Sequence, residues 1–161
     1  YYRLGTYATG ASHGEYSFSA GRFSHPTGAH SICVGYNNTS TGVGSIAIGK
    51  NCNSADEAGI SIGLEAKATG TRKYTRGGIE YTIGACAIGC YAEGQAYGSI
   101  SIGFMTIVDG SDGIAIGFYT HSGINDVAIG SFATASGFNN VSIGADSGAS
   151  GAYGCTAVGS Y

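Results

Sequence analysis

A five-residue pattern that recurs about every 14 residues constrains the fold more than any other feature of this chain. Its clearest copy reads Ser45-Ile46-Ala47-Ile48-Gly49. The glycines that close the copies are Gly21, Gly35, Gly49, Gly63, Gly77, Gly89, Gly103, Gly117, Gly130, Gly144 and Gly159. A unit this short cannot bury an apolar face alone, so the period predicts a solenoid in which successive coils stack on one another.

Branched residues alternate with small residues inside each copy, which is the period of a β-strand. A helix is disfavoured because glycine recurs about every seven residues and costs a helix about 1 kcal/mol at each site. We therefore expect an all-β fold whose coil is strand, turn, strand, turn. Stacked coils should pair in parallel at a spacing of about 4.8 Å.

Stacking should place equivalent branched residues over one another in continuous ladders. We expect burial of these side chains to stabilise the coil, and the small residues of the opposite face, such as Ala47 and Ser61, to be approached by another sheet. Several copies should then pack as a symmetric ring about the rod axis. The predicted ladder residues are Ile32, Ile46, Ile48, Ile60, Ile62, Ile88, Ile100, Ile102, Ile114, Ile116, Ile129 and Ile143.

Composition and motifs exclude several functional classes. The net charge is only −3 and no basic run occurs, which argues against a nucleic-acid partner. No stretch approaches 18 consecutive apolar residues, so the chain is not expected to span a membrane. The four histidines lack partners at recognisable spacing, and phosphate loops and nucleophile elbows are absent. We expect no catalytic residue, no metal site and no cofactor, although a β-rod could still arrange a pair of carboxylates for glycan cleavage.

Five cysteines occur without a Cys-x-x-Cys pair. Cys33 and Cys86 occupy slots of the repeat, which predicts that they act as small buried apolar residues. Unpaired thiols favour folding in a reducing compartment.

The repeat resembles the YadA-like head repeats of trimeric autotransporter adhesins, and similar repeats occur in bacteriophage tail fibres. The resemblance rests on Ser45-Ile46-Ala47-Ile48-Gly49 and its copies, and covers residues 14–161. It implies a left-handed parallel β-roll, a homotrimer, and a place outside the cell, on the cell surface or in a virion fibre. Its implied role is an adhesive and structural head or fibre segment that binds a host surface protein or glycan.

Three alternatives stay open, one of them a pure spacer whose recognition lies elsewhere in the chain. A bacteriophage tail-fibre segment for host receptor binding is favoured by the free cysteines, because such fibres assemble in a reducing cytoplasm. A glycan depolymerase fibre domain is a further alternative. No starter methionine or apolar leader precedes the repeats, so we expect a piece of a longer protein.

The domain organisation is expected to be simple. Residues 1–13 should form a cap or a link to a preceding segment, since terminal repeats are atypical. Residues 14–161 should form the β-roll, interrupted by an irregular basic coil at 64–89. This coil should bulge outward, because an unpaired charge is disfavoured in an apolar ladder.

The interruption supplies the candidate ligand-binding or surface-binding residues, which are Lys67, Arg72, Lys73, Tyr74 and Arg76. Arginine suits sulfate and carboxylate groups on an anionic glycan. The alternative is a solvated interruption, or an ion-pair network with Glu65 and Glu80.

Aromatic residues gather just after the closing glycines. They could pack between subunits, or form an outer strip that binds sugar rings or protein. These residues are Tyr36, Tyr91, Phe104, Phe118, Tyr119 and Phe132. Asp112, Asn125 and Asn139 occupy equivalent places in successive coils, where turn chemistry explains them best.

Overall fold

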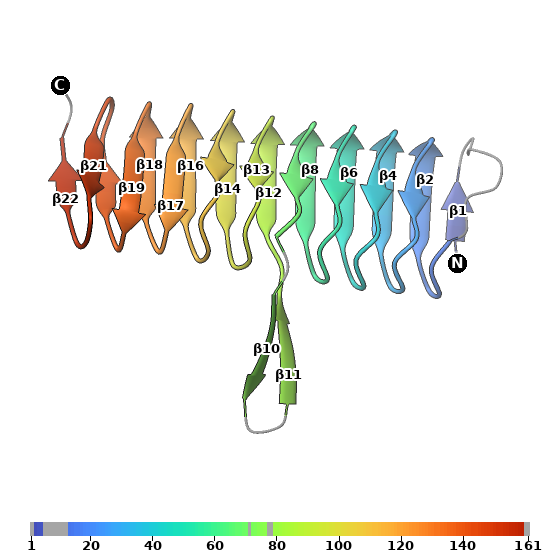
Figure 1. Cartoon of the computed structure of the whole chain (residues 1–161). Helices are drawn as coiled ribbons and strands as arrows, with labels where there is room; N and C mark the ends of the chain where they lie inside the picture. Colours follow the sequence, from blue (N-terminus) through green and yellow to red (C-terminus); the bar gives the residue numbers. More distant parts are fainter. Residues whose placement is uncertain (1, 5–12, 71, 77–78, 160–161) are drawn as a thin grey trace.

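The computed structural model describes residues 2–4, 13–70, 72–76 and 79–159; for residues 2–4, 72–74, 76 and 79–82 the description is limited to the backbone. Within these residues the chain contains strands and turns and no helix. It forms a parallel β-solenoid with coils of about 14 residues, drawn out as a rod from which one hairpin projects (Figure 1).

One long side of the rod is an eleven-stranded parallel sheet, to which each coil contributes one strand. Its strands, in spatial order, are β1 (Tyr2–Leu4), β2 (Phe18–Arg22), β4 (Ile32–Tyr36), β6 (Ile46–Lys50), β8 (Ile60–Leu64), β12 (Cys86–Cys90), β14 (Ile100–Phe104), β16 (Ile114–Phe118), β18 (Val127–Ser131), β20 (Val141–Ile143) and β22 (Thr156–Val158).

The other side is a nine-stranded sheet of mostly two-residue strands. They are β3 (His25–Pro26), β5 (Thr39–Ser40), β7 (Asn53–Ser54), β9 (Lys67–Ala68), β13 (Glu93–Gly94), β15 (Ile107–Val108), β17 (His121–Ile124), β19 (Thr134–Phe138) and β21 (Gly148–Gly151).

Equivalent residues of the repeat lie opposite one another in the eleven-stranded sheet. Ile48 pairs with Ile62, Ile62 with Ile88, and Ile102 with Ile116. The described closing glycines also stack from coil to coil, and they take a positive φ that β-branched residues avoid. Gly103, at φ +135°, has no room for a Cβ, which would meet the carbonyl oxygen of Gly117 on the next coil. The glycine at this position therefore fixes both the bend and the close stacking of the coils.

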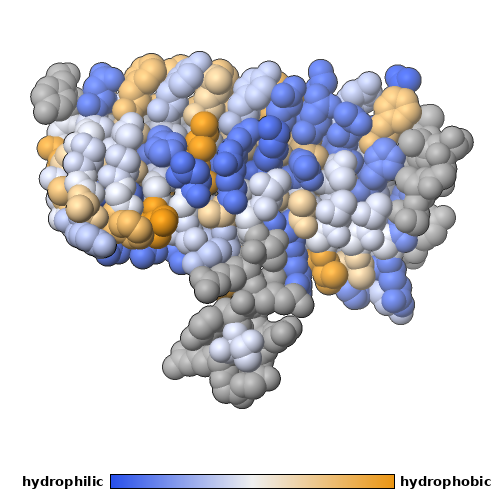
Figure 2. Space-filling view, in the orientation of Figure 1, coloured by the Kyte–Doolittle hydropathy of each residue, from blue (hydrophilic) through white to orange (hydrophobic). Residues whose placement is uncertain are grey.

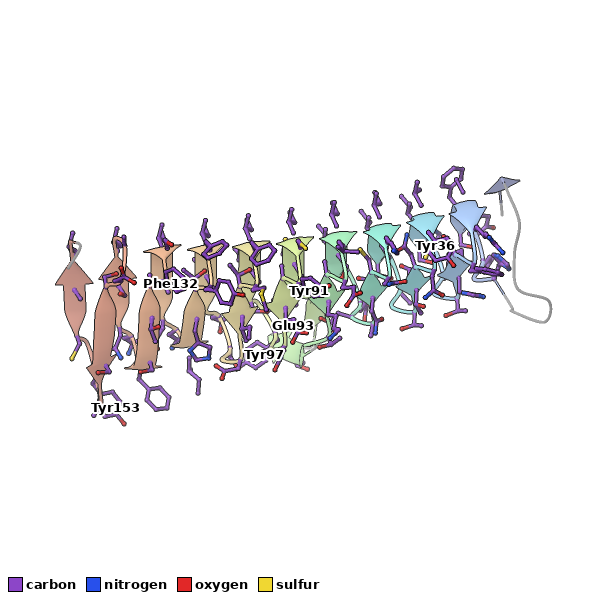
Figure 3. All side chains as sticks on the ribbon, turned by 90° about the horizontal axis from the view of Figure 1, so that it is seen from above. Tyr36, Tyr91, Glu93, Tyr97, Phe132 and Tyr153 are labelled. Carbon is purple, nitrogen blue, oxygen red and sulfur yellow. The ribbon has the colours of Figure 1, made fainter. Side chains whose placement is uncertain are left out.

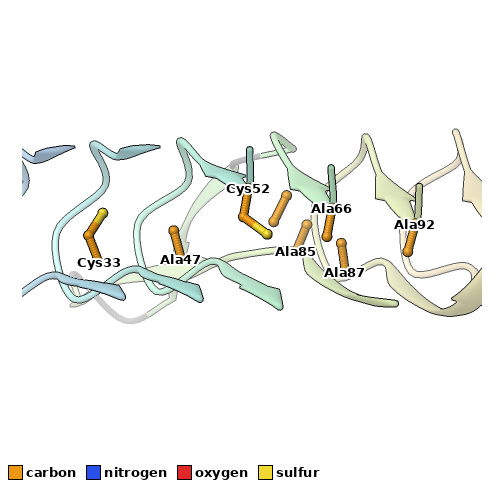
Figure 4. Packing of buried hydrophobic residues seen from close by; sticks show 8 residues of the cluster. Cys33, Ala47, Cys52, Ala66, Ala85, Ala87 and Ala92 are labelled. Atoms are coloured by element: carbon orange, nitrogen blue, oxygen red, sulfur yellow. The ribbon is translucent and has the colours of Figure 1, made fainter. Parts of the chain in front are cut away.

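The interior of the solenoid is lined by small residues rather than by the branched ones. Ser45, Ala47, Cys52 and Ser54, which point inward in one coil, are each at most 1% exposed. Figure 4 shows the same arrangement in adjacent coils, where alanines and cysteines fill the space between the two sheets. Facing sheets usually lie about 10 Å apart, but a coil of 14 residues closes more tightly and is filled mainly by methyl, thiol and hydroxyl groups, with Val108 and the buried asparagines among its largest side chains.

The prediction about the ladder faces is therefore wrong in one respect. Ile46 and Ile48 are only partly buried, while Ala47 between them is fully buried. The branched side chains lie on the outer surface of the eleven-stranded sheet, covered in part by their neighbours along the rod. The small residues, expected to face another chain, form the inside of their own chain.

Within the interruption predicted at 64–89 the structure has an inserted hairpin rather than an irregular coil, while β9 and β12 keep their places in the two sheets. Strand β8 pairs directly with β12, and Gly63 lies opposite Gly89, so the coil expected to close at Gly77 does not exist. Gly77 itself lies outside the described residues. Strands β10 (Arg72–Arg76) and β11 (Ile79–Ile83) pair antiparallel and project from the rod between β9 and β12 (Figure 1).

The predicted cap at 1–13 falls largely outside the described residues. Its strand β1 pairs in parallel with β2, so the first described segment adds one strand to the same sheet.

Candidate functional site

The outer surface of the eleven-stranded sheet is apolar along nearly the whole rod. Its first column contains Phe18, Ile32, Ile46, Ile60, Cys86, Ile100, Ile114, Val127 and Val141. Its second column contains Ala20, Val34, Ile48, Ile62, Ile88, Ile102, Ile116, Ile129 and Ile143. We call these two columns the aliphatic face. Figure 3 shows a row of carbon side chains along one side of the rod.

The opposite sheet presents a different chemistry. The outward residues of its strands are His25, Thr39, Asn53, Lys67, Glu93, Ile107, His121 and Thr134. Figure 2 shows hydrophilic residues along the middle of the rod, and in Figure 3 Glu93 lies on the side away from the carbon row. The rod is thus amphipathic across its thickness, and a continuous apolar face of this kind marks an interaction surface.

Lys67, the first of the predicted binding residues, is engaged within the rod. Its Nζ lies 2.6 Å from Oε1 of Glu93 on the next coil, and Nε2 of Gln95 donates to the other carboxylate oxygen at 2.7 Å. The hydrogen bond from Lys67 lowers the pKa of the Glu93 carboxyl. Since the two side chains are 48% and 24% exposed, this surface pair contributes at most about 1 kcal/mol.

The sequence did not reveal Glu93 as the partner of Lys67. The hairpin separates the two residues by 26 positions, although they lie directly opposite each other in register. The alternative prediction, an ion-pair network with Glu65 and Glu80, involves side chains outside the described ones; among the described residues Glu65 accepts a hydrogen bond from Asn51 at 3.4 Å. Recognising the spacing from Gly63 to Gly89 as one coil plus an insertion would have revealed the Lys67–Glu93 pair.

The other four predicted residues, Arg72, Lys73, Tyr74 and Arg76, all lie on β10, whose backbone is described and whose side chains here are not. The register places Tyr74 opposite Tyr81 and Arg76 opposite Ile79. The structure thus separates these four residues from Lys67. They lie on the projecting hairpin, whereas Lys67 lies on the nine-stranded sheet.

Five of the six predicted aromatics form one cluster at the edge where the strands of the eleven-stranded sheet end. Phe104 and Phe118 stack at 5.2 Å between ring centroids, and Tyr119 stacks on Phe132 at 5.5 Å. Phe118 meets Tyr119 edge-on at 4.7 Å, and Tyr91 meets Phe104 at 6.4 Å. We call these five residues the aromatic edge. Tyr36 lies apart, near Phe23 in the first coils.

The turn residues behave as turn chemistry predicts. Asp112, Asn125 and Asn139 have positive φ of 55°, 54° and 58°, a conformation that Asn and Asp tolerate better than most residues. Buried asparagines inside the solenoid were not predicted. Asn38 donates to the carbonyls of Val34 and Gly49 at 2.7 and 2.8 Å and accepts from the amide of Cys52 at 2.9 Å. Asn140 repeats this arrangement.

The cysteines are free in the described structure. Cys33 and Cys52 are buried inside the solenoid, and burial raises the pKa of Cys33 to about 12. Cys86 lies on the aliphatic face, where burial also raises its pKa. Among the side chains of residues 13–70 and 83–159, no group of three or more His, Cys, Asp or Glu is placed to hold a metal ion. No described segment is a helix of the length and apolar character that crossing a membrane requires.

Comparison with known families identifies the repeats. A family model described as YadA head domain repeat (2 copies) matches residues 27–51, 95–120 and 122–140. A search among curated proteins finds no match. The chain thus carries YadA-type head repeats, as the sequence pattern indicated, folded as a parallel β-solenoid. The YadA head is a surface-exposed adhesin domain, so the matched repeats point in general to an adhesin-like role.

Proposed function

We propose that this chain is a segment of a homotrimeric adhesive head or fibre, in which the aliphatic face of each chain packs around a common axis. The observation that carries the proposal is the contrast between the two sheets. Eighteen positions of the eleven-stranded sheet present a nearly unbroken apolar surface, whereas the solenoid interior is already filled by small residues of the same chain.

Threefold closure suits this geometry. Burying a branched side chain completely stabilises an assembly by about 1.5–3 kcal/mol, and the aliphatic face offers one or two such side chains per coil. A closed ring turns every copy of this face toward the axis and every polar sheet toward solvent. A twofold pair would also cover the face, so the oligomeric state is the first quantity to measure.

The attachment site in this proposal is the projecting hairpin. It carries Arg72, Lys73 and Arg76 on one strand, three of the chain's seven basic residues. A trimer displays this strand three times around the rod, so weak contacts with an anionic surface glycan, matrix polymer or acidic host protein would be multiplied by avidity. Lys67 does not belong to this site, because it is paired with Glu93.

Binding of the wild-type protein to sulfated or sialylated glycan surfaces tests the attachment site. Replacing Arg72 and Arg76 with serine should abolish binding and leave the oligomer intact. Replacing Arg22 and Lys67 with serine removes the same charge elsewhere and should preserve most of the binding. Equal losses in the two variants would reduce the interaction to general electrostatics, and unchanged binding in both would make the segment a spacer.

A bacteriophage tail-fibre segment is the second candidate, favoured by the five free thiols. The sequences flanking this segment distinguish the two. A heptad stalk followed by a membrane anchor supports the adhesin, and a tail-attachment domain supports the fibre.

A further inference from the structure

The two edges of the eleven-stranded sheet carry residues that complement one another at the same height along the rod. At one edge of this sheet the strands end, and Lys50 and the aromatic edge lie there. At the other edge the strands begin, just after turns such as the one that contains Glu57. Lys50 and Glu57 belong to the same coil and lie at its opposite ends. A lysine and a glutamate so placed cannot reach each other within one chain.

Rotation about an axis parallel to the rod keeps every coil at its own height. In a ring, the edge where the strands end in one chain meets the edge where they begin in the next, since the contact is heterologous. Lys50 of one copy is thereby brought level with Glu57 of the neighbouring copy. Lys50 is exposed and makes no side-chain ion pair among the described residues.

The aromatic edge is continuous with the aliphatic face. Phe104 and Phe118 follow Ile102 and Ile116 by two residues in the same strands, and the five rings of the edge are 37–51% exposed. In the first half of the rod the equivalent positions are mixed: Tyr36 and Leu64 flank Lys50 in register, while Asn37 donates to Asn51 at 3.0 Å and Asn51 to Glu65.

The stacking also limits what the aromatic edge can bind. Sugar rings bind aromatic side chains through a free ring face, but Phe104 and Phe118 lie face to face with an interplanar angle of 12°, as do Tyr119 and Phe132 at 13°. Each stacked pair therefore covers one face of both of its rings, and the remaining surface suits packing against aliphatic side chains.

We infer that the edge formed by Lys50 and the aromatic residues is a seam that packs against a second copy of this chain, on the edge where the neighbour's strands begin. Lys50 pairs there with the neighbour's Glu57, and the rings cover the start of the neighbour's aliphatic face. This inference rests on the proposed trimer and adds which edges meet.

Charge reversal tests the seam directly. Lys50→Glu should weaken the wild-type oligomer, because it places two acidic residues together at each seam, and Glu57→Lys should do the same. The double variant restores opposite charges and should recover most of the wild-type dissociation midpoint, measured by sedimentation at increasing dilution. If the double variant loses as much oligomer stability as the two single variants lose together, the pairing is overturned.

The contribution of the aromatic edge to the seam has a separate test. Phe118→Ser combined with Tyr119→Ser should lose the oligomer at concentrations where the wild type is fully assembled, whereas Ile107→Ser on the outer surface of the nine-stranded sheet should not. Full assembly of the double serine variant together with loss of glycan binding would overturn the seam in favour of a ligand strip. A wild type that is monomeric would instead contradict the proposed trimer itself, so the two failures are distinguishable.

Discussion

Replacing Ile116 with alanine should weaken assembly while leaving the chain folded, because Ile116 lies on the aliphatic face. The change removes three carbons per chain, worth about 2.4 kcal/mol if fully buried at about 0.8 kcal/mol per carbon. Ile116 is already partly covered by Ile102 and Ile129 of its own chain. Assigning half of the value to contacts between chains leaves about 1.2 kcal/mol per copy and about 3.6 kcal/mol per trimer.

At 1.4 kcal/mol for each factor of ten, this loss lowers the trimer association constant several hundredfold, to about 1/400 of the wild type. Sedimentation equilibrium measures it directly: the wild type should have a mass of about 48 kDa, three times the chain mass of 16.1 kDa. The Ile116→Ala variant should dissociate at a higher concentration than the wild type. Its thermal unfolding in the dilute, dissociated state should change much less.

A matched control is available on the other sheet. Ile107 is an outward-facing isoleucine, 38% exposed on β15, and the same truncation there should leave the association constant nearly unchanged. Ala115, the residue before Ile116, should affect folding rather than association, because it is fully buried inside the solenoid. Ala115→Leu should prevent folding, because overpacking a filled interior costs about 1–3 kcal/mol or more. Equal losses of association at Ile107 and Ile116 would refute the assignment of faces.

Three further predictions concern the single coil. Gly103→Ala should lower the melting temperature by an amount equivalent to more than about 1 kcal/mol, because a Cβ at φ +135° meets the Gly117 carbonyl; an unchanged melt would contradict the stacking. Asn38→Ala leaves three buried backbone groups without partners, at about 1–3 kcal/mol each, and should lower the urea midpoint far more than Asn37→Ala on the exposed surface. Glu93→Gln should lower the melting temperature slightly at pH 7. The folded pKa of Glu93 lies below its usual 4.5, so the ion pair contributes above that pH and is lost as the pH falls through the lowered value; the difference between wild type and variant should therefore disappear in acid. A difference that persists at pH 3 would show another origin.

The stacking of coils was predictable from the sequence, because a fixed period forces Ile48 over Ile62 whatever the shape of the coil. The face that points inward was not. Alternation separates Ile46 and Ile48 from Ala47, but either set fits a strand. The decision comes from the width of a 14-residue coil, which admits Ser45, Ala47, Cys52 and Ser54 and excludes isoleucine.

The inserted hairpin was hidden for a different reason. Gly77 falls on the period, since it lies 14 residues after Gly63, and this coincidence made the insertion resemble a degenerate coil. The charged residues Arg72 and Arg76 did indicate that this segment leaves the rod, and in the structure the backbone of β10 projects from it. The pair between Lys67 and Glu93 followed from the insertion and could not be found without it.

The most direct test of the central claim, that the aliphatic face is covered by other copies, uses the natural cysteines. Alkylation of the native assembly, read peptide by peptide by mass spectrometry, should leave Cys33 and Cys52 unmodified, because they are buried within one chain. Cys155, partly exposed near the end of the rod, should react. Cys86, also partly exposed in a single chain, should be protected in the assembly and should react once Ile116→Asp dissociates it. Reaction of Cys86 in the native protein at the rate seen in that variant would contradict the account.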